Sequence, residues 1–323
     1  MNAIREPGQI NQNTTLIDFG MRGAANTGAV YYINAGKSCL IDASGSKGEA
    51  KRVISYLRAN NMELPDFVIL THSHYDHCVG IHALQERAER ENHRMEVFAS
   101  KKEIPLLEDQ SHNKAFHTNE DYQNIHDVTP LSDGETIDLE GTSLSVTYTP
   151  GHTPGHIAIL DEQNKNLFVG CALGLKLSDN SFIPPFMPPF WDMNEYLKSI
   201  ERIRGIEYDS ICMAHFGYIF GEEAHSILDE SLSVCKQWWS VFESAEELGK
   251  LDDVNHIVER ILTDTNMEYP NIGLVDPKLR YGLKVLNATR RIRGKDSLTP
   301  ALVLMHENVV PWLTKGYRLF TNQ

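Results

Sequence analysis

The stretch Thr71-His72-Ser73-His74-Tyr75-Asp76-His77 decides how the other parts of this 323-residue sequence are interpreted. It directly follows Phe67–Leu70, a short apolar run of the kind expected for a strand buried on both faces. Three imidazoles and a carboxylate cannot all be packed at a strand end unless something compensates them. Divalent cations would do so, because neutral imidazole and carboxylate are good ligands for zinc, iron or manganese. A solvated polar loop is the alternative.

A second cluster, Thr149-Pro150-Gly151-His152-Thr153-Pro154-Gly155-His156, combines two histidines with glycine and proline. Glycine and proline shape a tight turn whose backbone can approach a ligand closely. We expect His152 to project from this turn toward a metal. His156 opens the next strand, so we expect it to support the site or the fold.

Short β-rich runs alternate with helical ones from about residue 14 to residue 230. Ala29–Asn34 and Lys37–Ala43 predict a hairpin, and Ser46–Asn60 and Val79–Arg90 have helical periodicity. An Asp-x-x-Glu capping box at Asp192 predicts a helix over Glu195–Ile203. Further strands are predicted at Met95–Ala99, Ser143–Thr149, His156–Leu160, Leu167–Gly170 and, as the last strand, Asp209–Met213.

After about residue 225 the sequence predicts helices and no further strands. Helices are predicted over Ala224–Ala245, Val254–Thr263, Pro277–Arg291 and beyond Thr299. We therefore expect an α/β domain over residues 1–228 and a C-terminal helical extension over 229–323. Residues 110–128 form a long polar loop, and its His112, His117 and His126 are expected to be solvated rather than ligands.

Charge and cysteine content narrow the classes of partner. Lys and Arg number 30 against 44 Asp and Glu, a net charge of −14 that repels phosphate backbones and anionic membranes. No run approaches about 18 apolar residues, and the first residues lack the apolar stretch of a secretory signal. Five scattered cysteines do not predict a disulfide framework. We expect a cytoplasmic protein that binds neither nucleic acid nor membrane.

The His-x-His-x-Asp-His block, the Thr-Pro-Gly-His-Thr-x-Gly-His turn and a later histidine resemble the metallo-β-lactamase superfamily, which includes glyoxalase II, acyl-homoserine lactonases and related thioesterases. The resemblance covers residues 14–220 and implies a four-layer αββα sandwich of the α/β class. It also implies two metal sites, the first held by His72, His74 and His152 and the second by Asp76, His77 and His215.

Two positions depart from the pattern of that superfamily. Cys171 follows Gly170 where relatives with two equivalent metals carry a bridging aspartate, and it resembles the ligand cysteine of one subclass of secreted metallo-β-lactamases. A thiolate favours zinc over iron or manganese, so we expect one or two Zn²⁺ per chain. The alternative is a small buried hydrophobe. Phe216 follows His215 where relatives carry glycine, which predicts an altered pocket wall and a poorer second site.

The resemblance implies hydrolysis by a metal-activated water. A divalent metal lowers the pKa of bound water from about 15.7 to near 7, and the resulting hydroxide adds to an acyl carbonyl. Asp76 would orient the water and later protonate the leaving group. Our leading hypothesis is a hydrolase of a thioester or lactone. A β-lactam hydrolase and a weakly active binding or regulatory protein with the same fold are the alternatives.

Aromatic residues outside the motifs favour a partly apolar small-molecule substrate. Ser181–Trp191 holds four prolines, three phenylalanines and a tryptophan, so it is either a rigid wall over the metals or a packing surface for the C-terminal helices. An acyl chain or ring therefore suits the site better than a sugar phosphate. The C-terminal helices, with Trp238, Trp239 and Trp312, are candidates for capping the site or for a homodimer face.

Overall fold

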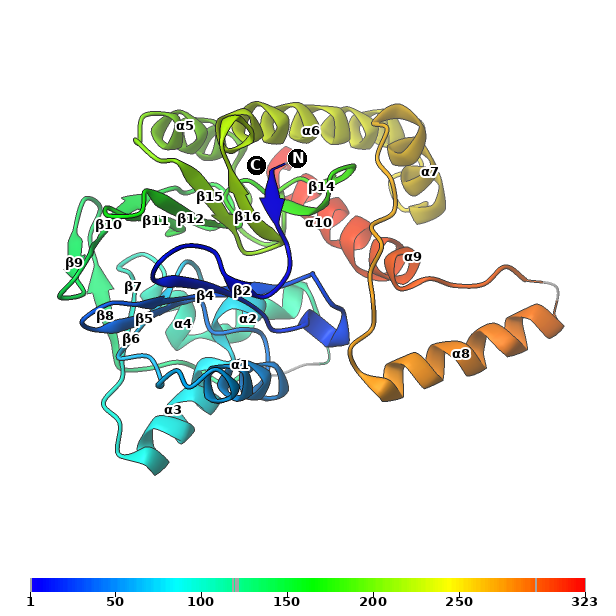
Figure 1. The fold of residues 1–323 in the computed structure, drawn as a ribbon. Coiled ribbons are helices and arrows are strands. Elements are labelled where there is room, and N and C mark those ends of the chain that lie inside the picture. Colours follow the sequence, from blue (N-terminus) through cyan, green and yellow to red (C-terminus); the bar gives the residue numbers. More distant parts are fainter. Residues whose placement is uncertain (1, 118, 120–121, 294, 323) are drawn as a thin grey trace.

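The computed structural model describes residues 2–117, 119, 122–293 and 295–322, and it shows two sheets packed face to face between helices (Figure 1). Each sheet has seven strands among these residues, and a separate two-stranded hairpin lies beside them. One group of helices covers the outer face of each sheet. This four-layer αββα arrangement confirms the predicted fold class.

The first sheet carries the strand that precedes the histidine motif. Its order is β2 (Gly8–Gln9), β3 (Thr14–Asp18), β4 (Ala29–Asn34), β5 (Ser38–Ile41), β6 (Phe67–Leu70), β7 (Glu96–Ser100) and β8 (Val128–Leu131). Strands β5 to β8 run parallel, so their carboxyl ends meet at one edge. Helices α1 (Lys47–Ala59) and α3 (Ile81–Glu91) cover the outer face, and the side chain of Ser46 caps α1 by accepting a hydrogen bond from the Glu49 amide.

The second sheet carries the other predicted ligands. Its order is β1 (Ala3–Ile4), β16 (Gly217–Phe220), β15 (Ser210–Met213), β12 (Asn166–Gly170), β11 (Ile157–Asp161), β10 (Ser143–Tyr148) and β9 (Thr136–Asp138). Helices α5 (Met193–Arg204) and α6 (Glu222–Glu247) cover its outer face. Helix α5 begins two residues before the predicted start, because Asp192 accepts hydrogen bonds from the amides of both Asn194 and Glu195.

Strand β16 corrects the prediction that the strand at 209–213 is the last one. The chain turns after His215 and returns antiparallel to β15, and the N-terminal β1 then pairs with β16. Phe216, at this turn, is fully buried in the core between the two sheets, where Ile33, Ile69 and Phe168 also lie. The expectation that Phe216 alters the pocket wall was therefore wrong. Its ring fills the core instead, where a buried aromatic side chain contributes about 1.5–3 kcal/mol.

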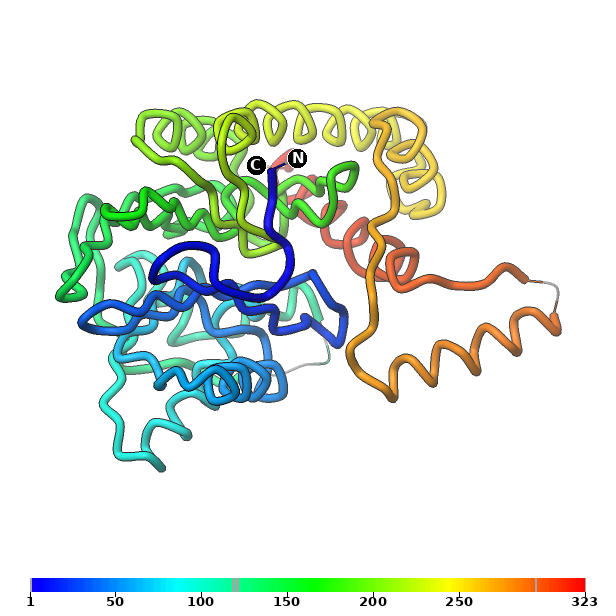
Figure 2. The backbone as a smooth tube through the Cα atoms, viewed as in Figure 1, coloured from blue at the N-terminus to red at the C-terminus, as the bar shows by residue number. Residues whose placement is uncertain are grey.

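The C-terminal helices α7 (Val254–Asp264), α9 (Pro300–Leu304) and α10 (Val310–Thr321) lie on the side of α6, with a π-helical turn over Met305–Val309 (Figure 2). One apolar cluster joins Ile211 of the sheet with Trp238 of α6, Ile257 of α7 and Leu313 of α10. Helix α6 runs through residue 228, and the domain boundary placed there stays a prediction. None of the helices within the described ranges is long and apolar enough to cross a membrane.

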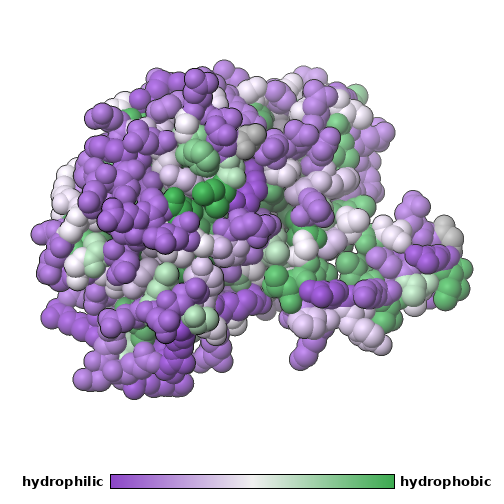
Figure 3. All heavy atoms as spheres, in the orientation of Figure 1, coloured by the Kyte–Doolittle hydropathy of each residue, from purple (hydrophilic) through white to green (hydrophobic). Residues whose placement is uncertain are grey.

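Helix α8 (Pro277–Ile292) projects from the body of the molecule (Figure 1). It has no buried residue, and several of its apolar side chains are exposed, namely Leu279, Tyr281, Val285, Leu286 and Ile292. Asp276 caps its first turn, and Asn287 exchanges two hydrogen bonds with the backbone of Leu298. The preceding segment pairs with the loop after β3 through an isolated bridge between Ala24 and Leu274. In Figure 3 apolar residues gather where α8 meets the body.

Candidate metal centre

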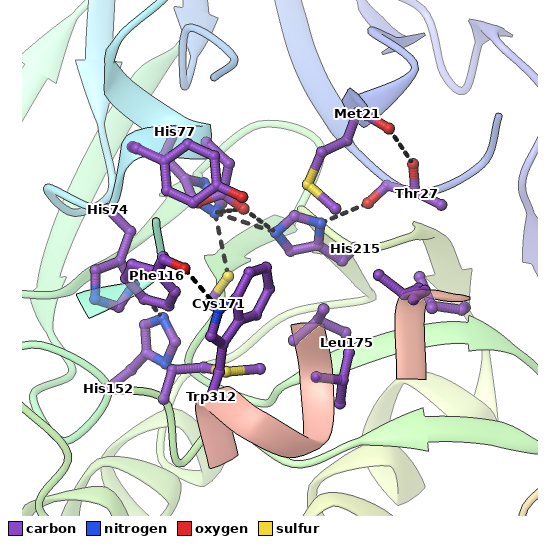
Figure 4. A pocket seen from close by; sticks show the side chains of 16 residues that line it. Met21, Thr27, His74, His77, Phe116, His152, Cys171, Leu175, His215 and Trp312 are labelled. Carbon is purple, nitrogen blue, oxygen red and sulfur yellow. Dashed lines mark hydrogen bonds and ion pairs between the residues drawn. The ribbon is translucent and has the colours of Figure 1, made fainter. Parts of the chain in front are cut away.

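The predicted ligands come from both sheets and meet at one edge of the sandwich. His72 follows β6, and His74 precedes the short helix α2 (Tyr75–Cys78) that carries Asp76 and His77. His152 lies in the turn between β10 and β11. Cys171 and His215 follow the parallel neighbours β12 and β15. Figure 4 shows His74 beside His152, and His77, Cys171 and His215 pointing toward one another.

The structure places the seven predicted ligands in three overlapping groups. These are His72, His74 and His152; Asp76, His77 and His215; and His72, His77 and Cys171. Within each group the ligand atoms lie within 4.8 Å of one another. His74 Nδ1 is 2.9 Å from His152 Nε2, and His77 Nε2 is 3.1 Å from His215 Nε2. The first two groups are the two metal sites that the resemblance implies.

Hydrogen bonds on the far side of each ring orient the histidines. His152 Nδ1 lies 2.7 Å from the carbonyl oxygen of Pro185, and His215 Nδ1 lies 2.6 Å from that of Thr27. His77 Nδ1 lies 2.8 Å from Asp42 Oδ2. Carbonyl and carboxylate oxygens only accept, so each Nδ1 carries the proton and, in the neutral ring, each Nε2 carries a lone pair. These lone pairs point into the cluster, which is the arrangement that orients histidine ligands around a metal.

Burial keeps the first group of histidines neutral. It lowers the pKa of His72 and His74 well below the ordinary value, and it lowers the pKa of His152 to about 4. The neighbouring imidazoles lower the pKa of His72 and His74 further, because positive charges would repel one another. Neutral imidazole is the form that binds metal, so at neutral pH these three side chains are ready to act as ligands.

The second group is instead arranged to hold positive charge. Burial opposes the charged form of His77, but Cys171, Asp76 and Asp42 outweigh it and raise the pKa of His77 to about 10. Burial also opposes the ionised form of Asp76, yet His77 and His215 hold the pKa of Asp76 well below its usual range. A site that attracts a proton so strongly also attracts a cation, since both satisfy the same anionic neighbours.

The donor set fits a divalent metal. Among the described residues, His72 Nε2 is buried without any hydrogen-bond partner, while His72 Nδ1 lies 3.0 Å from Thr71 Oγ1. His74 Nε2 is likewise buried and without a partner. A buried nitrogen left unpaired costs about 1–3 kcal/mol, which a metal bond at His72 Nε2 would remove. The imidazoles, the carboxylate and the thiol are all ligand types that zinc accepts.

Cys171 lies among the predicted metal ligands rather than packing only as a small buried hydrophobe. Its Sγ is 3.3 Å from His77 Nε2 and belongs to the group that also contains His72. Burial raises the pKa of the Cys171 thiol, and His77 beside it acts in the opposite direction. All five cysteines are buried with free thiols, but Cys171 is the one that joins a ligand group among the described residues.

His156 supports the cluster from behind. Its Nε2 accepts a hydrogen bond from the Cys171 amide at 3.1 Å, and its Nδ1 lies 2.9 Å from Thr149 Oγ1. Both ring nitrogens are therefore engaged by the protein. His156 thus ties the glycine-rich turn to the start of the Cys171 segment, in agreement with its predicted supporting role.

Two buried carboxylates escaped the sequence reasoning. Asp42, at the end of β5, accepts hydrogen bonds from both the amide and the hydroxyl of Thr71 and holds His77. Glu103 accepts from the amides of Ser73 and Gly155 and from the hydroxyl of Thr153. Glu103 therefore joins the two histidine motifs. Of these two residues, only Asp42 could have been found from the sequence, because it is an acidic residue directly after a buried strand.

Six of the seven ligands, all except His72, line a small cavity of about 40 Å³ with largely apolar walls. Asp76, whose side chain is 16% exposed, faces it together with His77 and His215. The opposite wall consists of Met21, Phe116, Leu175, Leu177, Met187, Leu304, Val309 and Trp312. Trp312 belongs to α10, so the C-terminal helices close one side of the site. This agrees with the expectation that these helices cap the site.

The linker over 181–191 fulfils both roles that the sequence left open. Met187 lines the metal cavity, and the carbonyl of Pro185 holds His152. Phe186 packs on Trp239 and Phe242 of α6, with ring centroids 5.4 and 5.5 Å apart. The start of the linker, Ser181–Ile183, is a strand, β14, that pairs with β13 (Leu175–Ser178).

The loop histidines stay outside the ligand groups, as expected, but only one of them is solvated. His126 is exposed. His112 is half-buried, and its Nε2 lies 3.2 Å from the carbonyl oxygen of Ser73. His117 is half-buried between the rings of Tyr75 and Trp312.

Fold and site together define a metal-binding protein of the αββα class. A sequence model of the metallo-beta-lactamase superfamily matches residues 22–215. The match covers more than half of the chain, so the chain belongs to the metallo-beta-lactamase superfamily.

Known relatives of the chain include a lactamase-like protein and a hydrolase. The lactamase-like protein nscB of Aspergillus fumigatus is 26% identical over 206 residues, 62% of this chain and 48% of that protein. Hydroxyacylglutathione hydrolase of Aeromonas hydrophila is 30% identical over 135 residues, 42% of this chain and 43% of the enzyme. The chain thus spans about half the length of these relatives. An archaeal superfamily protein from Sulfolobus tokodaii shares the fold, with a TM-score of 0.56 at 22% identity, covering 69% of this chain and 86% of that one.

Proposed function

We propose that this protein is a metal-dependent hydrolase of an acyl bond, a thioester or a lactone, in a small and partly apolar substrate. The observation that carries the proposal is the convergence of two ligand groups on one apolar cavity. His72, His74 and His152 would hold one zinc ion, and Asp76, His77 and His215 would hold a second, with Cys171 beside both. Bound zinc would polarise the acyl carbonyl and lower the pKa of the attacking water.

Asp76 is the residue best placed to handle the proton. Its Oδ2 lies 3.3 Å from His215 Nε2, and its side chain faces the cavity. The carboxylate can accept a hydrogen bond from the attacking water and later deliver a proton to the leaving group. Asp42 would hold the His77 ring in place during the reaction, because His77 Nδ1 keeps its proton and donates it in a hydrogen bond to Asp42 Oδ2.

The cavity walls support an acyl substrate over a phosphorylated one. Among the described residues, those that line the cavity include aromatic, aliphatic and methionine side chains and no lysine or arginine. A phosphate would need such cations, whereas a carbonyl with an apolar neighbour does not. The name of the Aeromonas relative, a hydrolase of an acyl-glutathione, supports the same class of bond. The free thiols support our further proposal of a reducing, cytoplasmic location.

The proposal is tested by assaying the zinc-reconstituted protein against thioesters, lactones and β-lactams in parallel. We expect kcat/KM for the thioesters or lactones to exceed that for the β-lactams. Turnover of β-lactams alone would replace the proposal with the β-lactamase alternative. Tight binding without turnover of any substrate would favour a binding or regulatory protein.

We expect the purified protein to contain one or two equivalents of divalent metal per chain, mainly zinc. The reason is the ligand set of neutral imidazoles, one carboxylate and one thiol. Elemental analysis by mass spectrometry, before and after zinc reconstitution, gives the stoichiometry. Less than about a tenth of an equivalent of bound metal per chain after reconstitution would contradict the prediction that these residues bind a metal.

We expect Cys171→Ser to weaken the second metal selectively, because a hydroxyl is a far poorer zinc ligand than a thiolate. Competition with a chelator measures the effect for each metal. Cobalt-loaded wild type should show a thiolate-to-cobalt charge-transfer band in the near ultraviolet that Cys171→Ser lacks. Cys235→Ser, on α6 and outside the site, is the matched control. A fully cobalt-loaded wild type without the band would leave Cys171 as a wall residue only.

A further inference from the structure

A second cavity adjoins the metal site. It has a volume of about 450 Å³ and lies between the body and α8. It shares five lining residues with the metal cavity, namely Met21, Thr27, Tyr75, Leu304 and Trp312. The two cavities therefore adjoin each other along these five side chains.

The metal cavity is too small to hold a whole substrate. Its volume of about 40 Å³ corresponds to roughly three water molecules, since one water needs about 10–15 Å³ by the same measure. An acyl carbonyl fits there, but a chain or ring attached to it does not. The rest of the molecule must extend beyond the metal cavity, and the larger cavity is within the usual size range of ligand pockets.

One face of α8 forms the outer wall of the larger cavity. Leu279, Gly282, Leu283 and Leu286 line it, and they are spaced three and four residues apart, as residues on one helical face are. Ile272 and Leu274 from the preceding segment and Val303 from α9 complete the apolar lining. The charged lining residues are Arg22 and Lys278, both cationic. Helix α8 has no buried residue, so packing against a core does not explain why its leucines lie on one face.

We propose that this cavity between α8 and the body binds the apolar arm of the substrate, an acyl chain, while its carbonyl lies at the metal centre. The inference rests on the proposed function and specifies its substrate as a medium-length aliphatic acyl thioester or lactone. Burying each further methylene of the chain should raise kcat/KM about fourfold, until the cavity is filled.

Gly282 allows the cavity to be filled without disturbing the fold. It lies on the same face of α8 as the lining leucines, and a Cβ added there would meet nothing within 4 Å. Leucine at this position would therefore occupy space that the substrate would otherwise use. The substitution also favours the helix, because glycine has a lower helix propensity than leucine.

The experiment measures kcat/KM for butanoyl, hexanoyl, octanoyl and decanoyl thioesters of N-acetylcysteamine on the full-length zinc protein. We expect kcat/KM of wild type to rise with chain length. Gly282→Leu should lose about tenfold or more on decanoyl and much less on butanoyl, with Gly282→Ala between the two. Ala288→Leu adds the same side chain to an exposed position of α8 that does not line the cavity, and it should match wild type.

Binding of straight-chain alcohols, followed by calorimetry, separates this inference from the proposed function. Affinity that rises from butanol to octanol and falls in Gly282→Leu supports the cavity even if no thioester is hydrolysed. Thioester hydrolysis that is independent of chain length and equal in wild type and Gly282→Leu overturns the cavity assignment and leaves the proposed function standing.

Discussion

His152→Ala and, in parallel, His72→Ala are expected to reduce hydrolysis to the background rate. Each substitution removes one of three imidazoles from the first ligand group, whose ligand atoms lie within 4.8 Å of one another. The neighbouring His156 cannot take the place of either lost ligand, because both of its nitrogens are engaged by Cys171 and Thr149. Bound metal should fall by about one equivalent, which elemental analysis will show together with the rate.

His126→Ala is the matched control, because His126 is exposed and lies outside the ligand groups. It should keep the activity within severalfold and the full metal content. Far-ultraviolet circular dichroism establishes that the inactive variants are folded. A folded His152→Ala protein that keeps both its metal and its rate would disprove the assignment of His152.

Glu103→Leu is expected to cost the fold roughly 3 kcal/mol or more. Glu103 is fully buried and accepts hydrogen bonds from two amides and one hydroxyl, those of Ser73, Gly155 and Thr153. Leucine has a similar size but accepts none of them. Each buried donor left unpaired costs about 1–3 kcal/mol. Equilibrium unfolding in urea of the zinc-free protein measures the loss without a contribution from metal binding.

Glu108→Leu provides the comparison, since Glu108 is exposed on the neighbouring helix α4 (Ile104–Glu108). It should change stability by less than about 0.5 kcal/mol. Because Glu103 joins the two histidine motifs, Glu103→Leu should also weaken metal binding by about 10–100-fold. Equal stability of the two variants would mean that the loops hold their positions without the carboxylate.

Local sequence patterns predicted most of the sandwich. The apolar run of β6, the hairpin of β4 and β5 and the helical periodicity of α1 each have a pattern within a few residues. The seven candidate ligands were also visible, because metal ligands occur in short motifs at strand ends. Their grouping in space followed from the resemblance, and the structure brings the same groups together.

Features that depend on distant contacts could not be predicted in this way. Strand β1 has two residues and no periodicity of its own, and the strand that it pairs with, β16, lies more than two hundred residues away. Glu103 looks like any surface glutamate, because its three donors come from segments 30 to 52 residues away. The burial of Phe216 between the sheets depends on how the chain turns after β15.

The weak anchoring of α8 has a consequence for how easily this protein can change through evolution. No side chain of α8 belongs to a core, so substitutions on the helix should cost the fold little, about 0.5 kcal/mol or less for surface positions. The metal ligands, by contrast, lie on loops held by buried hydrogen bonds, such as those of Asp42. Mutations can therefore accumulate on α8 while the metal centre stays unchanged.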